Sequence, residues 1–213
     1  MRNVLKLIAL LTMVIDHVGA VLYPNIIVLR MIGRISFPIF AYLLALGYKS
    51  THDAKKYLKR LLLFGLLSEI PYILAFNSDN LNIFFTLVLG LIIIMLYEKK
   101  EYLYIIIVFC FAAFLHVDYG IYGIFIILFM YVYVYHNKKL GVILFVLVTF
   151  IYSYFNILQI FAILSIPIIG LLENIPKDID IKKYKYVFYV FYPFHLALLY
   201  LVKICFFTGI VLY

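Results

Sequence analysis

Charged residues are scarce in this chain. Asp, Glu, Lys and Arg make up 13% of the 213 residues, and 68% of the residues are hydrophobic. A soluble domain is usually about a quarter charged and about half apolar. The mean hydropathy is +1.13. This composition excludes an ordinary soluble domain and predicts an integral membrane protein.

Cysteines and linker sequences are equally scarce. The two cysteines, Cys110 and Cys205, both lie in apolar segments. We therefore expect inert thiols inside the bundle, and we expect neither a disulfide framework nor a metal site. No Pro- or Ser-rich linker and no low-complexity run divides the chain. The sequence thus predicts a single membrane domain over residues 1–213.

Long apolar stretches fill the rest of the sequence. A bilayer core about 30 Å thick needs roughly 20 apolar residues in a helix. Runs such as LIIIML at 91–96 lack the alternation of a transmembrane strand, and a helix satisfies its own backbone groups in lipid. We predict an all-α, polytopic transmembrane bundle of about nine spans in the cell membrane. The predicted spans are 4–23, 27–48, 58–76, 81–97, 102–116, 119–135, 140–154, 157–172 and 186–208.

Basic residues recur in every second connection between these spans. They are Lys49, Lys55, Lys56, Lys59 and Arg60, then Lys99 and Lys100, then Lys138 and Lys139, then Lys177, Lys182, Lys183 and Lys185. The positive-inside rule then predicts a cytoplasmic N-terminus and an external C-terminus. The formal net charge of +8 is mainly a topology signal with attraction to anionic lipid, and we predict no nucleic-acid partner.

Polar side chains inside the spans gather at one depth, toward the predicted outer face. An ionisable group in hydrocarbon is costly, so each is a candidate functional residue. The group comprises Asp16, His17, Arg30, Arg34, Ser68, Glu69, Asn82, Thr86, His116, Asp118 and Tyr119. Two interpretations stay open. The residues form ion pairs that join helices, for example Arg34 with Glu69 or Asp16, or they line a polar cavity open to the outer face.

A second group of residues marks the predicted cytoplasmic edge. Lys6 precedes His17 by eleven residues. In a helix these eleven residues rotate the chain by about 1100°, which is within about 20° of three full turns. Lys6 and His17 therefore lie on one helix face, about 16 Å apart along the axis. Lys56, Lys59 and Arg60 lie at the start of the third span. These cations are either ordinary flanking residues or a site for a phosphate-bearing donor that enters from the cytoplasm and extends toward His17.

His17 is the natural candidate for a general base. Acyl transfer from a thioester to an amine or hydroxyl needs a base near neutral pH, and imidazole fits. It also needs cations to hold the donor's phosphates. Asp16 is adjacent in sequence but about 100° around the helix. It could therefore pair with Arg34 or another helix instead of the His17 ring.

Blocks along nearly the whole chain carry a family resemblance. They are LKLIA at 5–9, MVIDHVG at 13–19, GRISFPIFA at 33–41 with GY at 47–48, RLL at 60–62 with SEIPY at 68–72, Asn82 with Thr86 and Gly90, DYG at 118–120 with Gly123, and YPFHL at 192–196. In this order the blocks resemble the TraX family of membrane acetyltransferases. That family is also similar to a broader superfamily of transmembrane acyltransferases. Enzymes of this superfamily share a basic residue and a histidine on an early span, which Lys6 and His17 resemble. They also share a basic pair near the cytoplasmic start of a later span, which Lys56 and Lys59 resemble.

The resemblance implies acetyl-CoA as the acyl donor, used from the cytoplasmic side, and an extracytoplasmic acceptor. The named family activity is N-acetylation of the pilin N-terminal amine, although nothing in this sequence identifies a pilin. We therefore expect an acetyl-CoA-dependent transfer to an amine or hydroxyl of a peptide or envelope glycan. The sequence leaves the oligomeric state open, and an oligomer is compatible with it.

The expected site has three parts. The catalytic group is His17 as base, with Asp16, Glu69 and Arg34 balancing charge around it. The donor-binding group is Lys6, Lys56, Lys59 and Arg60. The substrate-binding group is Asn82, Thr86, Asp118, Tyr119 and His195. For His195 the alternative is a core histidine bonded across helices.

Two other functional classes fit the same residues. An ion-coupled transporter would use the buried Asp, His, Glu and Arg as a proton relay, and a discontinuous helix or an inverted repeat would favour it. A non-catalytic scaffold for envelope assembly would tolerate substitution of Asp16 and His17.

Overall fold

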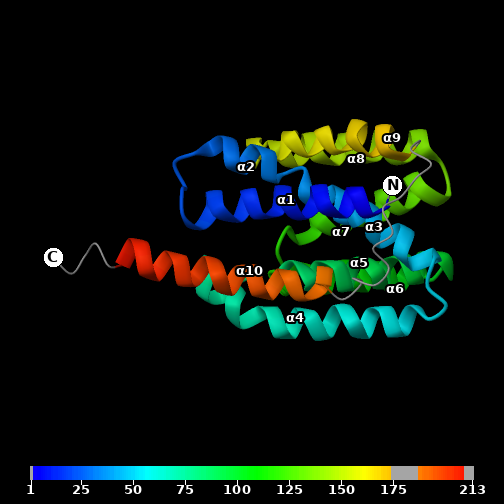
Figure 1. Cartoon of the computed structure of the whole chain (residues 1–213). Coiled ribbons are helices and arrows are strands. Elements are labelled where there is room, and N and C mark those ends of the chain that lie inside the picture. The colour runs from blue at the N-terminus through cyan, green and yellow to red at the C-terminus, as the bar shows by residue number, and fades with distance from the viewer. Residues whose placement is uncertain (1, 174–186, 209–213) are drawn as a thin grey trace.

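The chain forms a bundle of helices in the computed structural model, which describes residues 2–173 and 187–208 (Figure 1). The elements are α1 Arg2–Val21, α2 Ile27–Gly33, α3 Ser36–Lys49, α4 Ala54–Phe76, α5 Ile83–Glu98, α6 Tyr102–Phe114, α7 Gly120–Tyr135, α8 Lys138–Ser153, the 3₁₀-helix η1 Ile157–Leu164, α9 Ser165–Glu173, α10 Val187–Lys203 and a π-helical turn Ile204–Thr208. The all-α prediction is confirmed. Each predicted span coincides with a helical segment, the second being α2 with α3 and the eighth being η1 with α9.

The helices differ in how well their length matches a bilayer. Among the described residues, three segments are long and apolar enough to cross, Arg2–Val21, Ile27–Lys49 and Phe188–Phe206. Shorter apolar helices cover Ile83–Glu98, Tyr102–Phe114, Gly120–Tyr135 and Ile157–Glu173. Short helices require local thinning of the bilayer or flanking residues that reach the interface. The protein is thus a helical membrane protein, and the side that each end faces stays a prediction.

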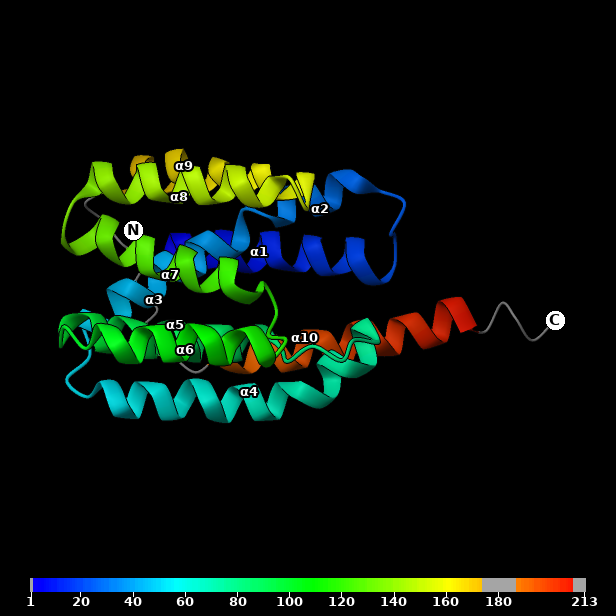
Figure 2. The same cartoon turned by 180° about the vertical axis from the view of Figure 1, so that it is seen from behind.

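Connections that carry lysine meet at the end of the bundle that holds the N-terminus (Figures 1 and 2). Lys49, at the end of α3, pairs with Glu98, at the end of α5, at 2.9 Å. Lys138, at the start of α8, pairs with Glu173, at the end of α9. The fourth basic connection, residues 174–186, lies outside the described residues. Three basic connections therefore share one end, as the charge pattern predicts.

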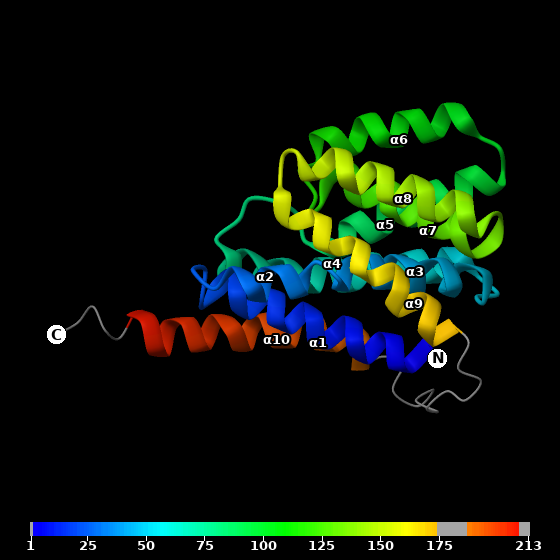
Figure 3. The same ribbon diagram turned by 90° about the horizontal axis from the view of Figure 1, so that it is seen from above.

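The outer surface of the bundle is apolar, and part of its interior is polar. In α4, Leu66 is 59% exposed and Ile70 is 71% exposed, whereas Ser68 is fully buried. In α6, Phe114 is 79% exposed, and α6 lies at the edge of the bundle far from α1 and α10 (Figure 3). This reverses the pattern of a soluble protein. It is typical of helices in lipid, where small and polar residues face neighbouring helices.

Both cysteines lie on this outer surface. Cys110 in α6 and Cys205 after α10 are free and exposed. The expectation of thiols inside the bundle was therefore wrong. An apolar neighbourhood in the sequence does not distinguish a lipid-facing side chain from one packed against another helix.

The second predicted span is interrupted where its sequence is most polar. α2 ends at Gly33 and α3 begins at Ser36. The Ser36 hydroxyl donates to the Ala9 carbonyl in α1 at 2.8 Å. A Cβ on Gly33 would lie 2.1 Å from Asp16 Oδ1, so only glycine allows α2 to approach α1 this closely. The interruption places Arg34 beside Asp16.

Candidate active site

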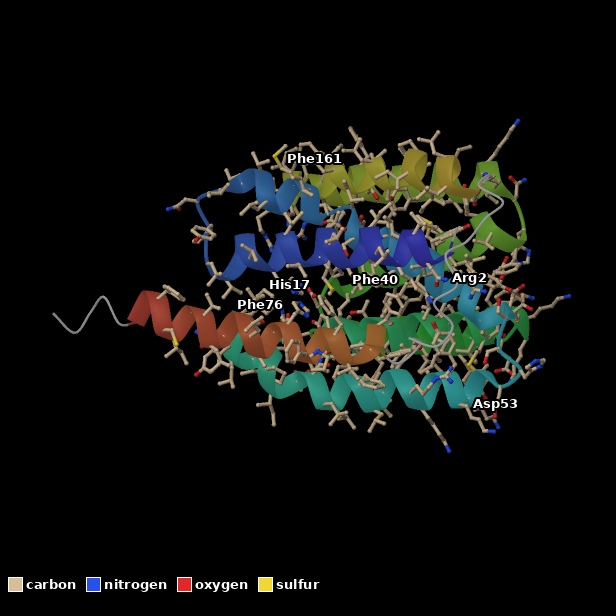
Figure 4. The ribbon with its side chains drawn as sticks, in the orientation of Figure 1. Arg2, His17, Phe40, Asp53, Phe76 and Phe161 are labelled. Atoms are coloured by element: carbon tan, nitrogen blue, oxygen red, sulfur yellow. The ribbon has the colours of Figure 1, made fainter. Side chains whose placement is uncertain are left out.

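A cavity of about 530 Å³ runs through the middle of the bundle. Its lining comes mainly from α1, α3, α4, α5 and α10, with the α6–α7 connection closing one side. It includes both Arg2, at the start of α1, and His17, near the end of that helix. Figure 4 shows Arg2, Phe40 and His17 in succession along the bundle. The cavity therefore connects the N-terminal end of the bundle with its polar depth.

The end of the cavity near the N-terminus is cationic. Arg2, Lys6 and Arg60 line it. Arg2 Nη1 donates to Ser50 Oγ at 3.2 Å, and Lys6 Nζ donates to Asn3 Oδ1 at 3.3 Å. The buried Nε of Arg60 has no hydrogen-bond partner among the described residues. A buried donor without a partner is costly, so this mouth is suited to an anionic ligand.

The wall between the two ends is apolar. It includes Leu10, Met13, Phe40, Leu44 and Leu87. Such a wall excludes water and strengthens charge interactions at the inner end. The cavity thus suits a ligand with a charged head and a long, weakly polar arm.

The inner end holds a buried ion-pair cluster centred on Asp16. Arg34 Nη2 lies 2.8 Å from Asp16 Oδ1, and Arg30 Nη1 lies 2.8 Å from Asp16 Oδ2. The Arg34 guanidinium also lies 5.5 Å from the centre of the Tyr119 ring. Asp16 therefore balances two guanidiniums instead of orienting the His17 ring. The sequence-based pairing of Arg34 with Asp16 is confirmed.

The α6–α7 connection supplies a second carboxylate to the inner end. Asp118 and Tyr119 both line the cavity. Their loop is fixed because Leu81 donates to the His116 carbonyl at 3.1 Å and accepts from the Asp118 N–H at 2.9 Å. The Thr86 hydroxyl donates to the Asp118 carbonyl. Asp118 and Tyr119 thus lie at the inner end of the cavity, and their role as substrate contacts stays a prediction.

His17 lines the cavity and contacts a second histidine. Its Nδ1 lies 2.7 Å from Nε2 of His195 in α10, and the two ring planes are 12° apart with their centres 5.0 Å apart. The His17 ring also lies nearly perpendicular to the Phe76 ring, with the ring centres 5.0 Å apart, and Figure 4 labels the two residues in the same part of the bundle. His195 is 5% exposed and does not line the cavity in the described part of the chain. It lies behind His17, so the geometry favours the alternative of a histidine bonded across helices over a direct substrate contact.

Three predicted residues of the inner cluster join helices instead of lining the cavity. The Glu69 carboxylate accepts from Asn82 Nδ2 at 2.5 Å and from its backbone N–H at 3.2 Å. Asn82 also caps α5 by accepting from the Phe84 N–H at 3.0 Å. Glu69, Asn82 and Thr86 are absent from the cavity lining across the described residues. The expected charge balance between Glu69 and Arg34 is therefore corrected, since Glu69 faces α5.

Two predicted donor-binding lysines also lie elsewhere. Lys56 and Lys59 are exposed at the start of α4, while Arg60 on the same helix lines the cavity. Lys56 pairs with Asp53 at 3.7 Å, and its backbone N–H donates to that carboxylate, which lowers the pKa of Asp53. One residue is about 100° of helix rotation. The packing of α4 thus turns Arg60 inward and Lys59 outward.

Several residues that line the cavity were not among the predicted site residues. Arg2 resembled an ordinary N-terminal cation, and Tyr57, Tyr189 and Tyr192 resembled general span packing among 21 tyrosines. Arg30 belonged to the polar group, but no role was assigned to it. Its spacing of four residues from Arg34 could have suggested a shared partner. In the residues that the structure describes, no group of three or more His, Cys, Asp or Glu could hold a metal.

Comparison with known proteins gives the family. Over 92% of both chains, this chain is 29% identical to the probable fimbrial assembly protein FimC, serogroup H1, of Dichelobacter nodosus. It is 31% identical over 42% of its length to an uncharacterized protein of Rickettsia prowazekii (strain Madrid E), covering 34% of that protein. No solved structure matches. The model of the TraX protein family matches residues 1–203, and this chain therefore belongs to the TraX family.

Proposed function

We propose that this protein is an acetyl-CoA-dependent membrane acetyltransferase. The donor enters from the cytoplasm at the basic end of the bundle, and the acetyl group passes to an amine or hydroxyl of an extracytoplasmic peptide or glycan. One observation carries the proposal. A single cavity joins a cationic mouth to His17 through an apolar wall.

The mouth residues suit the phosphates of coenzyme A. Arg2, Lys6 and Arg60 come from the starts of α1 and α4, which lie together at the N-terminal end. Arg60 lines this mouth, and its Nε is a buried donor with no hydrogen-bond partner in the part of the chain that the structure describes. Charge-assisted bonds to phosphate are about twice as strong as neutral ones. The apolar wall beyond the mouth would hold the pantetheine arm.

The inner end supplies the chemistry. His17 takes the proton of the acceptor amine or hydroxyl as that group attacks the thioester. Arg30 and Arg34 lie in the same part of the cavity and would stabilise negative charge that develops on the thioester oxygen. Asp16 keeps both guanidiniums in place, and Asp118 and Tyr119 would contact the acceptor.

The relative from Dichelobacter nodosus supports an acceptor in the cell envelope. Its name assigns it to fimbrial assembly. A peptide amine that becomes part of an extracellular filament is one acceptor of the proposed class. A glycan hydroxyl is the other.

An ion-coupled transporter is the second candidate, and the interruption between α2 and α3 favours it. Broken helices at mid-membrane are common in transporters, where they surround a substrate site. Here the break holds Arg34 against Asp16. A cationic mouth that suits phosphates is not needed for proton coupling, which is why we prefer the transferase.

The deciding experiment replaces His17 in protein purified into lipid nanodiscs. We expect His17→Gln to bind acetyl-CoA normally and to lose transfer, or acetyl-CoA hydrolysis if no acceptor is known, by about 10²–10⁴-fold. A base acts in the transition state, so its loss affects turnover more than affinity. His116→Gln is the matched control, since His116 is exposed in the α6–α7 connection. Wild-type protein that neither transfers nor hydrolyses acetyl groups, yet moves protons or solutes, would establish the transporter instead.

A further inference from the structure

Two histidines from opposite ends of the chain form one hydrogen-bonded unit. His17 Nδ1 lies 2.7 Å from His195 Nε2, and His195 Nδ1 lies 2.9 Å from the carbonyl oxygen of Phe191. The two imidazole planes are 12° apart. Of the two histidines, His17 alone lines the cavity. The order from the cavity outward is therefore His17, His195 and a backbone carbonyl.

The carbonyl at the end of this series determines where the protons lie. A carbonyl oxygen only accepts hydrogen bonds, so His195 Nδ1 must carry a hydrogen. A neutral imidazole has a single N–H, so His195 Nε2 is an acceptor. His17 must then donate from Nδ1, and its Nε2 keeps an unprotonated lone pair.

A doubly protonated His195 would reverse the middle bond, but its surroundings oppose it. His195 is 5% exposed, and no acid is its hydrogen-bond or ion-pair partner in the described part of the chain. The charged side chains that line the inner end of the same cavity as His17 are Asp16, Asp118, Arg30 and Arg34. Asp16 already balances both arginines. A further buried cation without its own counter-ion is costly.

We infer that His195 is a positioning residue that holds His17 in the tautomer whose Nε2 acts as the base. This inference rests on the proposed acetyl transfer. His195 touches neither donor nor acceptor and acts only through His17. Its role is to fix the ring by accepting from Nδ1–H, so that the free lone pair belongs to the other nitrogen.

The pair also has a role during transfer. The acceptor's lone pair forms a bond to the thioester carbon, and its proton moves to His17 Nε2. The C–S bond then breaks, and the same proton passes from Nε2 to the departing thiolate. In between, His17 is an imidazolium, and its Nδ1–H donates a charge-assisted bond to His195 Nε2. Such a bond is stronger than the neutral one, so His195 favours the charged state through which the reaction passes.

The test compares two replacements of His195. His195→Gln can keep an acceptor oxygen near the position of Nε2, whereas His195→Leu has none. We expect His195→Leu to lower kcat roughly 10- to 100-fold with the KM for acetyl-CoA unchanged. We expect His195→Gln to restore most of this loss. A residue that only packs α10 against α1 would not distinguish the two variants in this way.

Nitrogen-15 NMR of labelled protein in bilayers measures the tautomer itself, and His17→Gln assigns the signal. Wild-type His17 should carry its hydrogen on Nδ1, and His195→Leu should shift it toward Nε2. A wild-type His17 protonated on Nε2 would overturn the inference even if His195→Leu fails to fold. So would equal kcat in His195→Leu and wild type. Absence of transfer and hydrolysis in the wild type would instead overturn the proposed function, and with it the role of the pair in turnover, while the tautomer is still measured.

Discussion

Arg60 offers the sharpest test of the donor site, because its neighbour Lys59 is a matched control on the same helix. Arg60 lines the cationic mouth and its Nε lacks a hydrogen-bond partner among the described residues, whereas Lys59 is exposed outside the cavity. Arg60→Ala and Lys59→Ala remove the same formal charge within one helical turn. A difference between them therefore reports contact with the ligand and not the general field of the protein.

The size of the effect follows from the geometry of the mouth. A charge-assisted hydrogen bond contributes about 1.5–3 kcal/mol, which corresponds to roughly 10- to 150-fold in Kd. Arg60 is only partly buried, and solvent screening weakens such contacts. We therefore expect Arg60→Ala to weaken acetyl-CoA binding by about tenfold and Lys59→Ala to have a much smaller effect. Arg60→Lys should fall between them, because it keeps the charge but loses the planar fork.

Titration calorimetry in nanodiscs of neutral lipid measures these affinities without anionic lipid as a competitor. Repeating the titration at two salt concentrations separates direct contact from long-range attraction, which salt screens. Equal losses in Arg60→Ala and Lys59→Ala would refute the assignment of the mouth. Unchanged affinity in Arg60→Ala would leave the mouth cations as topology signals alone.

Three further predictions concern the inner cluster and the topology. Gly33→Ala should lower thermal stability and transfer together, because the new Cβ would lie 2.1 Å from Asp16 Oδ1; a thermal unfolding curve like that of the wild type would contradict the close packing of α2 on α1. Asp16→Ala should cost about 3–5 kcal/mol of stability by leaving the buried Arg34 guanidinium without its ion-pair partner. Adding Arg34→Met should recover part of that loss, whereas additive losses in the double variant would argue against the pair. In a background without the two native cysteines, Asn80→Cys but not Lys99→Cys should react with an impermeant thiol reagent in intact cells, and the opposite result would reverse the donor and acceptor sides.

Some contacts in the site could be predicted from the sequence of one helical segment, and others could not. Lys6 and His17 share a helix face because helical periodicity is a property of one segment, and the structure places both on the same cavity. Arg34 pairs with Asp16 across a short connection. The partner of Glu69 could not be predicted in this way, because it depends on which neighbouring helix that face of α4 contacts. It bonds Asn82 and not Arg34.

The membrane class, the helical segments and the gathering of polar residues at one depth could all be predicted before the fold was known, because they follow from hydropathy and from the cost of charge in hydrocarbon. Which members of that polar group contact one another depends on how the helices pack. His17 and His195 are 178 residues apart, and nothing local to either block brings them together. The rotation of α4 that separates Arg60 from Lys59 is likewise set by packing against α5 and α10. A helix in lipid has no strong hydrophobic preference between its faces, so contacts with its neighbours determine which side chains turn inward.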